Sequence, residues 1–213
     1  LTTNLDTKNS LIEFYGKSNT KINIVIKDNI DIKGKVTSAG SLALEKNIAS
    51  KNAFIIQKLI DADFQIAGKA NLSEWANFRS EDSASGWSSY GGQTKHFLNN
   101  EYNPCGSSSG SAVAVAAGIV DIAIGTETNG SISCPSSVNG IVGFKPTVGL
   151  VSRSGIVPIS STQDTAGPMG KSVALVAKTL EVIAGYDPLD PSTKDIPDDL
   201  DLNFSRDLEL SSI

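Results

Sequence analysis

The sequence has few of the residues that build disulfide frameworks and metal sites. Its 213 residues include only two cysteines, Cys105 and Cys134, and one histidine, His96. These numbers exclude a disulfide-rich scaffold and a zinc site made of cysteine and histidine, and they predict no metal. We expect both cysteines to be small, partly buried thiols and His96 to be an exposed loop residue. A redox-sensitive cysteine pair stays open, because each cysteine lies in a serine-rich segment.

Basic stripes and long apolar runs are absent as well. The chain has 18 Lys and Arg against 23 Asp and Glu, for a net charge of -5. This balance argues against nucleic acid as a partner. The most apolar stretch, residues 113–124, is interrupted by Gly118 and Asp121 and does not reach the roughly 20 residues that a membrane span needs. We therefore expect no membrane partner and a cytoplasmic location.

The beginning of the chain carries no recognisable targeting signal. It starts with Leu1 and lacks a charged segment followed by an apolar one. Either a start or leader was removed, or the chain was trimmed, and the sequence leaves both open. With 39% hydrophobic and 19% charged residues, the composition is that of an ordinary globular protein with one large or two small domains.

Strand and helix signals alternate in the first third of the chain. Residues 21–27 place three isoleucines on one face of a predicted strand. Residues 50–63 have apolar positions at helical spacing, with Ser50 as the expected N-cap. A short strand is expected at 64–67, ending at Gly68. This strand–helix–strand order predicts a parallel sheet.

Further elements are expected downstream. Helices are predicted over 110–118 and 172–184, and buried strands over 121–125 and 141–144. Residues 74–104 are polar with scattered aromatic side chains, and they indicate a long ordered loop. The fold class is therefore α/β, with a mixed, mainly parallel sheet flanked by helices.

We divide the chain into three parts. Residues 1–21 are a polar N-terminal segment, 22–186 form the core, and 187–213 are an acidic irregular tail or the start of a C-terminal part.

Two turns rich in serine and glycine, 106–111 and 125–131, lie on either side of the apolar run from Ala112 to Ile124. A serine in such a turn can be an exposed nucleophile with backbone N–H groups beside it, as acyl transfer requires. A base is also needed. Lys27 is a better candidate than His96, because burial at the end of an apolar strand would lower its pKa. A strand-end lysine that reaches solvent is the alternative from composition alone.

Ordered motifs across most of the chain resemble those of the amidase signature family. Two further segments, Leu72 to Arg79 and Ser85 to Ser88, look most like its peptide amidase branch. The family motifs occur at Val25 to Ile30, Gly106 to Ser111, Gly125 to Ile132, Gly140 to Thr147, Gly149 to Gly155 and Gln163 to Met169.

The resemblance implies catalytic roles for three residues. Ser131 matches the family's nucleophile and Lys27 its base. Ser107 matches a bridging serine that follows Gly106 through a cis peptide bond and relays a proton between the other two. The amide carbonyl would then acylate Ser131, and water would hydrolyse the acyl-enzyme.

The resemblance also implies supporting residues. Backbone N–H groups of Thr128, Asn129, Gly130 and Ser131 would hold the oxyanion. Ser108 would support the hydrogen-bond network, with a helix N-cap as the equally weighted structural role. Asp164 is expected to be a carboxylate that supports the site, with Arg153 either pairing with it or capping a turn. The aromatic residues Trp75, Trp87 and Tyr90 are expected either to line a cleft or to pack the long loop.

The expected reaction is hydrolysis of a small amide or a peptide C-terminal amide to a carboxylate and ammonia, with no cofactor. Alternatives are the amide-cleaving subunit of a tRNA-dependent amidotransferase and an inactive remnant with a binding role. Family domains are longer than this chain. A fragment, a split gene with a complementing chain, a homodimer that covers its own open side, and a degenerate remnant all stay open.

Overall fold

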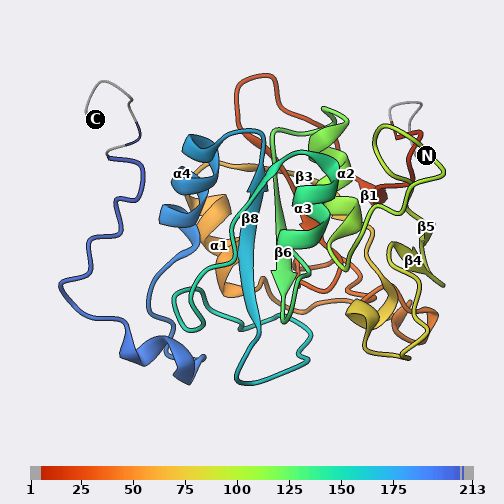
Figure 1. The fold of residues 1–213 in the computed structure, drawn as a ribbon. Helices are drawn as coiled ribbons and strands as arrows, with labels where there is room; N and C mark the ends of the chain where they lie inside the picture. The colour runs from red at the N-terminus through yellow and green to blue at the C-terminus, as the bar shows by residue number, and fades with distance from the viewer. Residues whose placement is uncertain (1–5, 207, 209–213) are drawn as a thin grey trace.

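The computed structural model describes residues 6–206 and 208, and these residues form a six-stranded mixed sheet (Figure 1). The three central strands β3, β2 and β6 are parallel, whereas β1, β8 and β7 run antiparallel to their neighbours. The expected α/β class with a mixed sheet and a parallel centre is confirmed. In spatial order the strands are β1 (Leu11–Phe14), β3 (Gln65–Ala70), β2 (Asn23–Lys27), β6 (Ile122–Glu127), β8 (Thr165–Gly170) and β7 (Val142–Gly143).

Helices cover both faces of this sheet. Helices α1 (Phe54–Asp61) and α4 (Val173–Ile183) pack together on one face, and α2 (Ser109–Ala116) covers the other beside α3 (Ser133–Asn139). Short elements complete the fold: η1 (Leu42–Leu44), η2 (Glu74–Asn77), the hairpin β4 (Trp87–Ser88) and β5 (Gly92–Gln93), and η3 (Pro191–Asp195).

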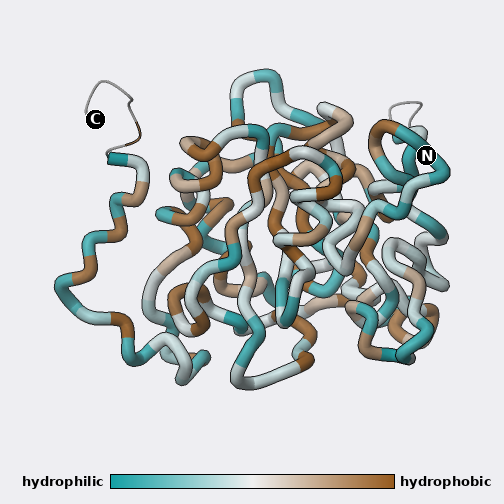
Figure 2. Tube along the Cα trace, in the orientation of Figure 1, coloured by the Kyte–Doolittle hydropathy of each residue, from teal (hydrophilic) through white to brown (hydrophobic). Residues whose placement is uncertain are grey.

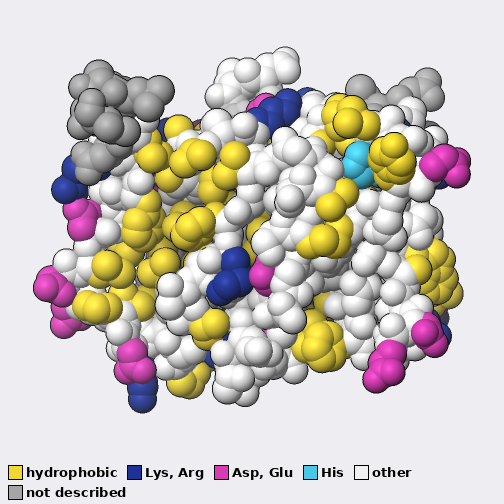
Figure 3. Space-filling view, viewed as in Figure 1, with side chains coloured by type: hydrophobic (Ala, Val, Ile, Leu, Met, Phe, Trp, Pro, Cys, Tyr) yellow, Lys and Arg dark blue, Asp and Glu magenta, His cyan; other side chains and the backbone are white. Residues whose placement is uncertain are grey.

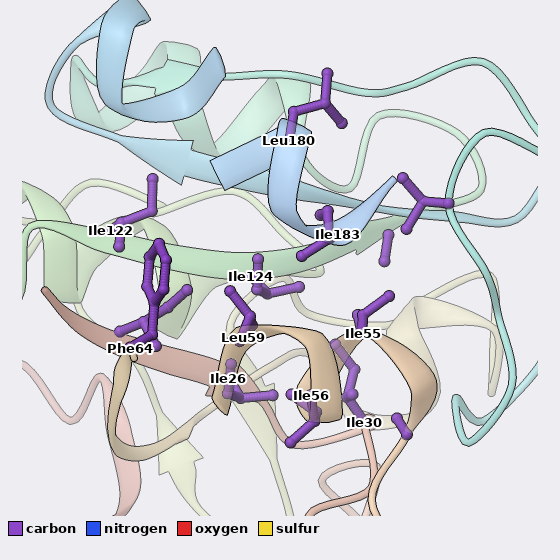
Figure 4. Packing of buried hydrophobic residues seen from close by; sticks show 14 of the residues in the cluster. Ile26, Ile30, Ile55, Ile56, Leu59, Phe64, Ile122, Ile124, Leu180 and Ile183 are labelled. Carbon is purple, nitrogen blue, oxygen red and sulfur yellow. The ribbon is translucent and has the colours of Figure 1, made fainter. Parts of the chain in front are cut away.

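Strand β2 explains why the centre of the sheet is buried on both sides. Ile24 and Ile26 belong to the buried cluster that includes side chains of α1 and α4, and Figure 4 shows Ile26 beside Leu59 and Ile56 of α1. Val25 belongs to the cluster on the α2 side. A strand buried on both faces is apolar at consecutive positions, as parallel central strands typically are. In Figure 2 the hydrophobic colours gather in these central strands and helices. Lys27, the last residue of β2, is therefore held in the interior.

The first predicted helix and the second predicted strand have different bounds from those expected. Helix α1 begins at Phe54 with Ala53 as its cap, so Ser50 is not the N-cap. Strand β3 does not end at Gly68 but continues to Ala70. At Gly68 a Cβ would lie 2.3 Å from the carbonyl oxygen of Glu13, so this glycine permits the close approach of β1.

Two strands of the six-stranded sheet were not predicted from the sequence, nor was the hairpin of β4 and β5 inside the expected long loop. Strand β1 lies inside the polar N-terminal segment, and β8 contains Pro168 and two glycines, which are unfavourable for a strand interior. Gly167 fits because a Cβ there would lie 2.2 Å from the carbonyl oxygen of Phe144.

Part of the acidic segment after α4 is buried. Asp187 accepts a hydrogen bond from Ser152 Oγ at 2.5 Å, and Asp190 binds Arg153.

Among the helices of the described part of the chain, none is both long and apolar enough to cross a membrane. On the face shown in Figure 3, Lys and Arg side chains are scattered and do not form a continuous patch.

Candidate active site

Lys27 lies at the carboxyl end of β2 with its side chain fully buried. Its Nζ is 2.7 Å from Ser107 Oγ, 2.8 Å from Thr126 Oγ1 and 3.2 Å from the Thr126 carbonyl oxygen. Within the part of the chain that the structure describes, no carboxylate forms a salt bridge with this amine. The alternative of a solvent-reaching lysine is wrong, because the strand end is covered.

Burial lowers the pKa of Lys27 from its usual 10.5 to about 7. Desolvation disfavours the ammonium form, and the negative charges of Glu127 and Asp164 offset only part of this effect. A large share of Lys27 is therefore the neutral amine near pH 7, and this form can accept a proton.

Ser107 is fixed by an unusual backbone. The Gly106–Ser107 peptide bond is cis, and the Ser107 carbonyl oxygen accepts a hydrogen bond from Ser73 N at 3.0 Å. A Cβ at Gly106 would lie 2.3 Å from Ser73 Oγ, so only glycine fits there. The turn thus directs the Ser107 hydroxyl toward the lysine amine.

Ser108 connects this turn to its neighbours. Its Oγ donates to the Thr126 carbonyl at 3.1 Å and accepts from Thr126 N at 3.2 Å. Its N–H donates to the Ser131 carbonyl at 3.1 Å. Ser108 stands at the N-cap position of α2 but makes no side-chain capping bond there. The bond to Ser131 brings that serine beside the turn that holds Ser107.

Glu127 organises the turn that carries Ser131, a role that was not predicted from the sequence. Its carboxylate accepts hydrogen bonds from the N–H groups of Gly130, Ile132 and Ser133 at 2.7–2.9 Å. Burial alone would raise the pKa of Glu127, but these hydrogen bonds hold it below its usual value. An acidic residue shortly before a helix was the available signal.

The contact with Glu127 corrects the expected oxyanion set. The Gly130 N–H is already used by Glu127 at 2.9 Å, so Gly130 is not a free donor. Within residues 6–206 and 208, the N–H groups of Thr128, Asn129 and Ser131 make no intramolecular hydrogen bond. Three donors therefore remain of the four expected.

Asp164 holds the neighbouring loop against the same turn. Its carboxylate accepts from Thr128 Oγ1 at 2.6 Å and from the N–H groups of Ile159 and Ser160. Of the two roles left open for Arg153, pairing with Asp164 is not the one observed. Arg153 donates to both carboxylate oxygens of Asp190, a bidentate arrangement that suits the planar guanidinium.

The two cysteines and the histidine also differ from expectation. Cys105 and Cys134 form a disulfide, because the chain brings the residue before Gly106 next to α3. His96 is buried, not exposed, and its Nε2 lies 3.0 Å from the Val138 carbonyl oxygen. The histidine thus joins the long loop to α3.

Two cavities open beside the site. One of about 270 Å³ borders Thr126, Glu127 and Thr128, and one of about 310 Å³ is lined by Trp75 and Phe78. The linings share four residues: Asn29, Val157, Pro158 and Ile159. Neither lining includes Lys27, Ser107 or Ser131.

The three aromatic residues that were expected either to line a cleft or to pack the long loop lie in different places. Trp75 lines the second cavity, and Trp87 lines a separate one with Glu74 and Arg79. Tyr90 is partly buried, and its N–H donates to the Gly40 carbonyl at 3.0 Å.

Comparison with known proteins places this geometry in a family. The family model described as Amidase matches residues 20–211. A probable amidase of Arabidopsis thaliana is 48% identical over 172 residues, and a glutamyl-tRNA(Gln) amidotransferase subunit of Methanosarcina acetivorans is 43% identical over 172. The match covers 80% and 81% of this chain, respectively.

Solved structures agree. The peptide amidase of Stenotrophomonas maltophilia is 49% identical with a TM-score of 0.85, over 90% of this chain and 43% of that protein. An amidase family protein of Bacillus anthracis is 37% identical with a TM-score of 0.90, over 95% and 44%. The chain spans about a third of the length of the curated relatives, 34% and 35% of the two given above.

Proposed function

The chain belongs to the Amidase family, and from this premise we propose that its site hydrolyses a carboxamide to a carboxylate and ammonia. The observation that carries the proposal is the 2.7 Å contact between the buried Lys27 amine and the Ser107 hydroxyl. A neutral amine in this position is a proton acceptor, and a hydroxyl both donates and accepts.

The proposed mechanism moves one proton along three side chains. Ser107 passes its hydroxyl proton to Lys27 while it takes the proton of Ser131, and Ser131 Oγ then attacks the amide carbonyl carbon. The N–H groups of Thr128, Asn129 and Ser131 stabilise the oxyanion. The proton returns through Ser107 to the departing nitrogen. The C–N bond breaks, ammonia leaves, and water hydrolyses the acyl-enzyme.

Peptide C-terminal amides are the substrate class that we favour. The similarity to a peptide amidase supports this choice, and the cavity beside Trp75 and Phe78 offers an apolar surface for a side chain. Similarity to one component of an amidotransferase favours the second candidate, in which ammonia passes to a partner. Glutamine-dependent ammonia release that requires added tRNA-binding subunits would favour this candidate.

Ammonia release from a panel of amides and peptide amides tests the proposal. We expect Ser131→Ala and Lys27→Ala to lose activity by at least about a thousandfold, because each removes part of the proton path. Ser137→Ala and Lys33→Ala are matched controls, since both residues are exposed, and they should retain activity. Unchanged release in both site variants would overturn the mechanism.

Labelling by a fluorophosphonate probe separates an enzyme from an inactive remnant. The probe reacts with an activated serine, so we expect labelling of the folded wild type and none of Ser131→Ala. A protein that melts cooperatively but takes up no probe would instead be a remnant of the family.

A further inference from the structure

Asn29, two residues beyond Lys27, has an unusual set of hydrogen bonds. Only 4% of its surface is exposed. Its Nδ2 donates to Thr126 Oγ1 at 3.0 Å, and its backbone carbonyl accepts from Val157 N at 2.9 Å. The side chain is therefore anchored at its nitrogen end, and this anchor fixes the direction of the other end of the amide.

The other end, Asn29 Oδ1, is buried and has no hydrogen-bond partner within the described part of the chain. Leaving a buried amide oxygen without a donor destabilises the folded state. Asn29 also lines both cavities beside the site. Because Asn29 belongs to both cavity linings, a ligand bound there is the candidate donor for this unpaired oxygen.

We propose that Asn29 determines specificity by accepting a hydrogen bond at Oδ1 from an N–H group of the substrate. The inference rests on the proposed amide hydrolysis. The donor that fits is the peptide N–H of the residue that bears the C-terminal carboxamide. This group lies two bonds from the reacting carbonyl carbon.

Hydrogen bonds near the site explain why this N–H is the one selected. Thr126 Oγ1, which receives the Asn29 amide, lies 2.8 Å from Lys27 Nζ, and that nitrogen lies 2.7 Å from Ser107 Oγ. Asn29 is thus three hydrogen bonds from the Ser107 hydroxyl. The nitrogen of the carboxamide itself must meet the proton relay, which leaves the neighbouring N–H for Asn29.

The proposal defines a substrate class. N-acylated amino acid amides and peptide amides carry the required N–H, whereas simple alkyl amides do not. A peptide that ends in proline amide also lacks it, because proline has no backbone N–H. We expect both of the latter classes to be poor substrates.

The test compares two substrates that differ in one atom group. N-acetyl-phenylalaninamide carries the N–H, and O-acetyl-phenyllactamide has an oxygen in its place with no added bulk. We expect wild type to prefer the first by about tenfold in kcat/KM, the value of one hydrogen bond of ~1.4 kcal/mol. The ratio for each enzyme is measured at pH 9, above the pKa of about 7 that Lys27 has in wild type, and because it compares two substrates of one enzyme, the protonation of Lys27 in each variant cancels.

Two variants of the same size assign this preference to Oδ1. Asn29→Leu removes the acceptor, so its substrate ratio should fall to about one. Asn29→Asp keeps an oxygen acceptor in the cavity, so its ratio should stay near that of wild type. A ratio in Asn29→Leu equal to that of wild type, or a loss of preference in Asn29→Asp, would overturn the proposal.

A binding measurement separates this inference from the proposed reaction. If wild type released no ammonia from either amide, the reaction would fail, and calorimetric titration of Ser131→Ala with both amides would decide the inference. The role of Asn29 is supported if Ser131→Ala binds the N–H compound more tightly than the ester, and if the two affinities become equal when Asn29→Leu is added. Equal affinity in the Ser131→Ala protein contradicts it. Thermal melts establish that each variant is folded.

Discussion

At the scale of single residues, two buried lysines on adjacent strands have opposite surroundings. Lys69 on β3 lies 2.9 Å from the carboxylate of Asp28 and donates to the Ile30 carbonyl at 2.7 Å. Lys27 on β2 has hydroxyl and carbonyl oxygens as its only partners in the described structure. Burial lowers the pKa of both lysines, but the charge of the adjacent Asp28 opposes this effect at Lys69, whereas no carboxylate of the described residues contacts Lys27.

The first prediction concerns how activity depends on pH. Because the pKa of Lys27 is about 7, the fraction of neutral amine rises as pH rises through this value. We expect kcat/KM to increase about tenfold per unit below pH 7 and to level off above it. Lys27→Arg should be inactive at every pH, because a guanidinium stays charged. A profile that is flat from pH 5 to 9 would contradict the role of Lys27.

The second prediction concerns Glu127. Glu127→Gln removes a negative charge that raises the pKa of Lys27, so the acid limb of the pH–rate profile should move to lower pH. The substitution also weakens three N–H contacts that shape the Ser131 turn, and we expect kcat to fall about tenfold to a hundredfold.

The exposed Glu81→Gln serves as the control for this substitution and should change neither quantity. A fall in kcat with an unmoved acid limb would mean that Glu127 acts on the turn alone and does not influence the amine.

At the scale of elements, the disulfide joins the two segments that carry the proposed serines. Cys105 precedes the Gly106–Ser107 bond, and Cys134 lies in the first turn of α3, three residues after Ser131. The bond closes a sequence separation of 29 residues, which corresponds to roughly 3 kcal/mol of stabilisation through the unfolded chain. It holds the Ser107 turn and the Ser131 turn in one unit.

We therefore expect a Cys105→Ala, Cys134→Ala double variant to melt roughly 10 °C lower than wild type. Reduction by a dithiol should have the same effect, and kcat should fall in both cases more than KM changes. Mass measurement after thiol alkylation gives the oxidation state. Reduction that also lowered the melting temperature of the double variant would show that the effect is not due to this bond.

Element prediction from sequence succeeded where local signals were sufficient. Helix α4 has Ser172 as its cap, accepting from Leu175 N, and β2 follows its apolar run. Strand β8 was missed because Pro168 and its glycines oppose strand formation locally. The strand forms because neighbouring atoms approach its glycines too closely for a larger side chain to fit.

At the site, too, some residues could be predicted from the sequence and others could not. Resemblance to the family motifs predicted Lys27 and the two serine-bearing turns, because the order of the motifs along the chain shows which residue matches which. It did not reveal Glu127 or the open end of Asn29. Their hydrogen bonds depend on how a turn closes and on what a neighbouring strand leaves unpaired.

At the scale of the whole molecule, the neutral lysine that serves the proposed chemistry weakens the fold. In the unfolded chain Lys27 has a pKa near 10.5, and in the folded protein near 7. Below pH 7 the folded state buries a charged ammonium group, and the full free-energy cost of desolvating that charge lowers its stability. Between these two values the unfolded chain binds more protons, so the free energy of unfolding rises with pH.

The last prediction follows from this linkage. Lys27→Met fills the same space without a charge, so it should be more stable than wild type at pH 6, and the difference should shrink steadily toward pH 10. A shift from 10.5 to about 7 sets its total change on the order of 5 kcal/mol. Urea unfolding of both proteins at each pH measures it, since other titrating groups cancel in the difference. A constant difference would mean that Lys27 does not lose its proton in the folded protein, and the proposed proton path would lose its acceptor.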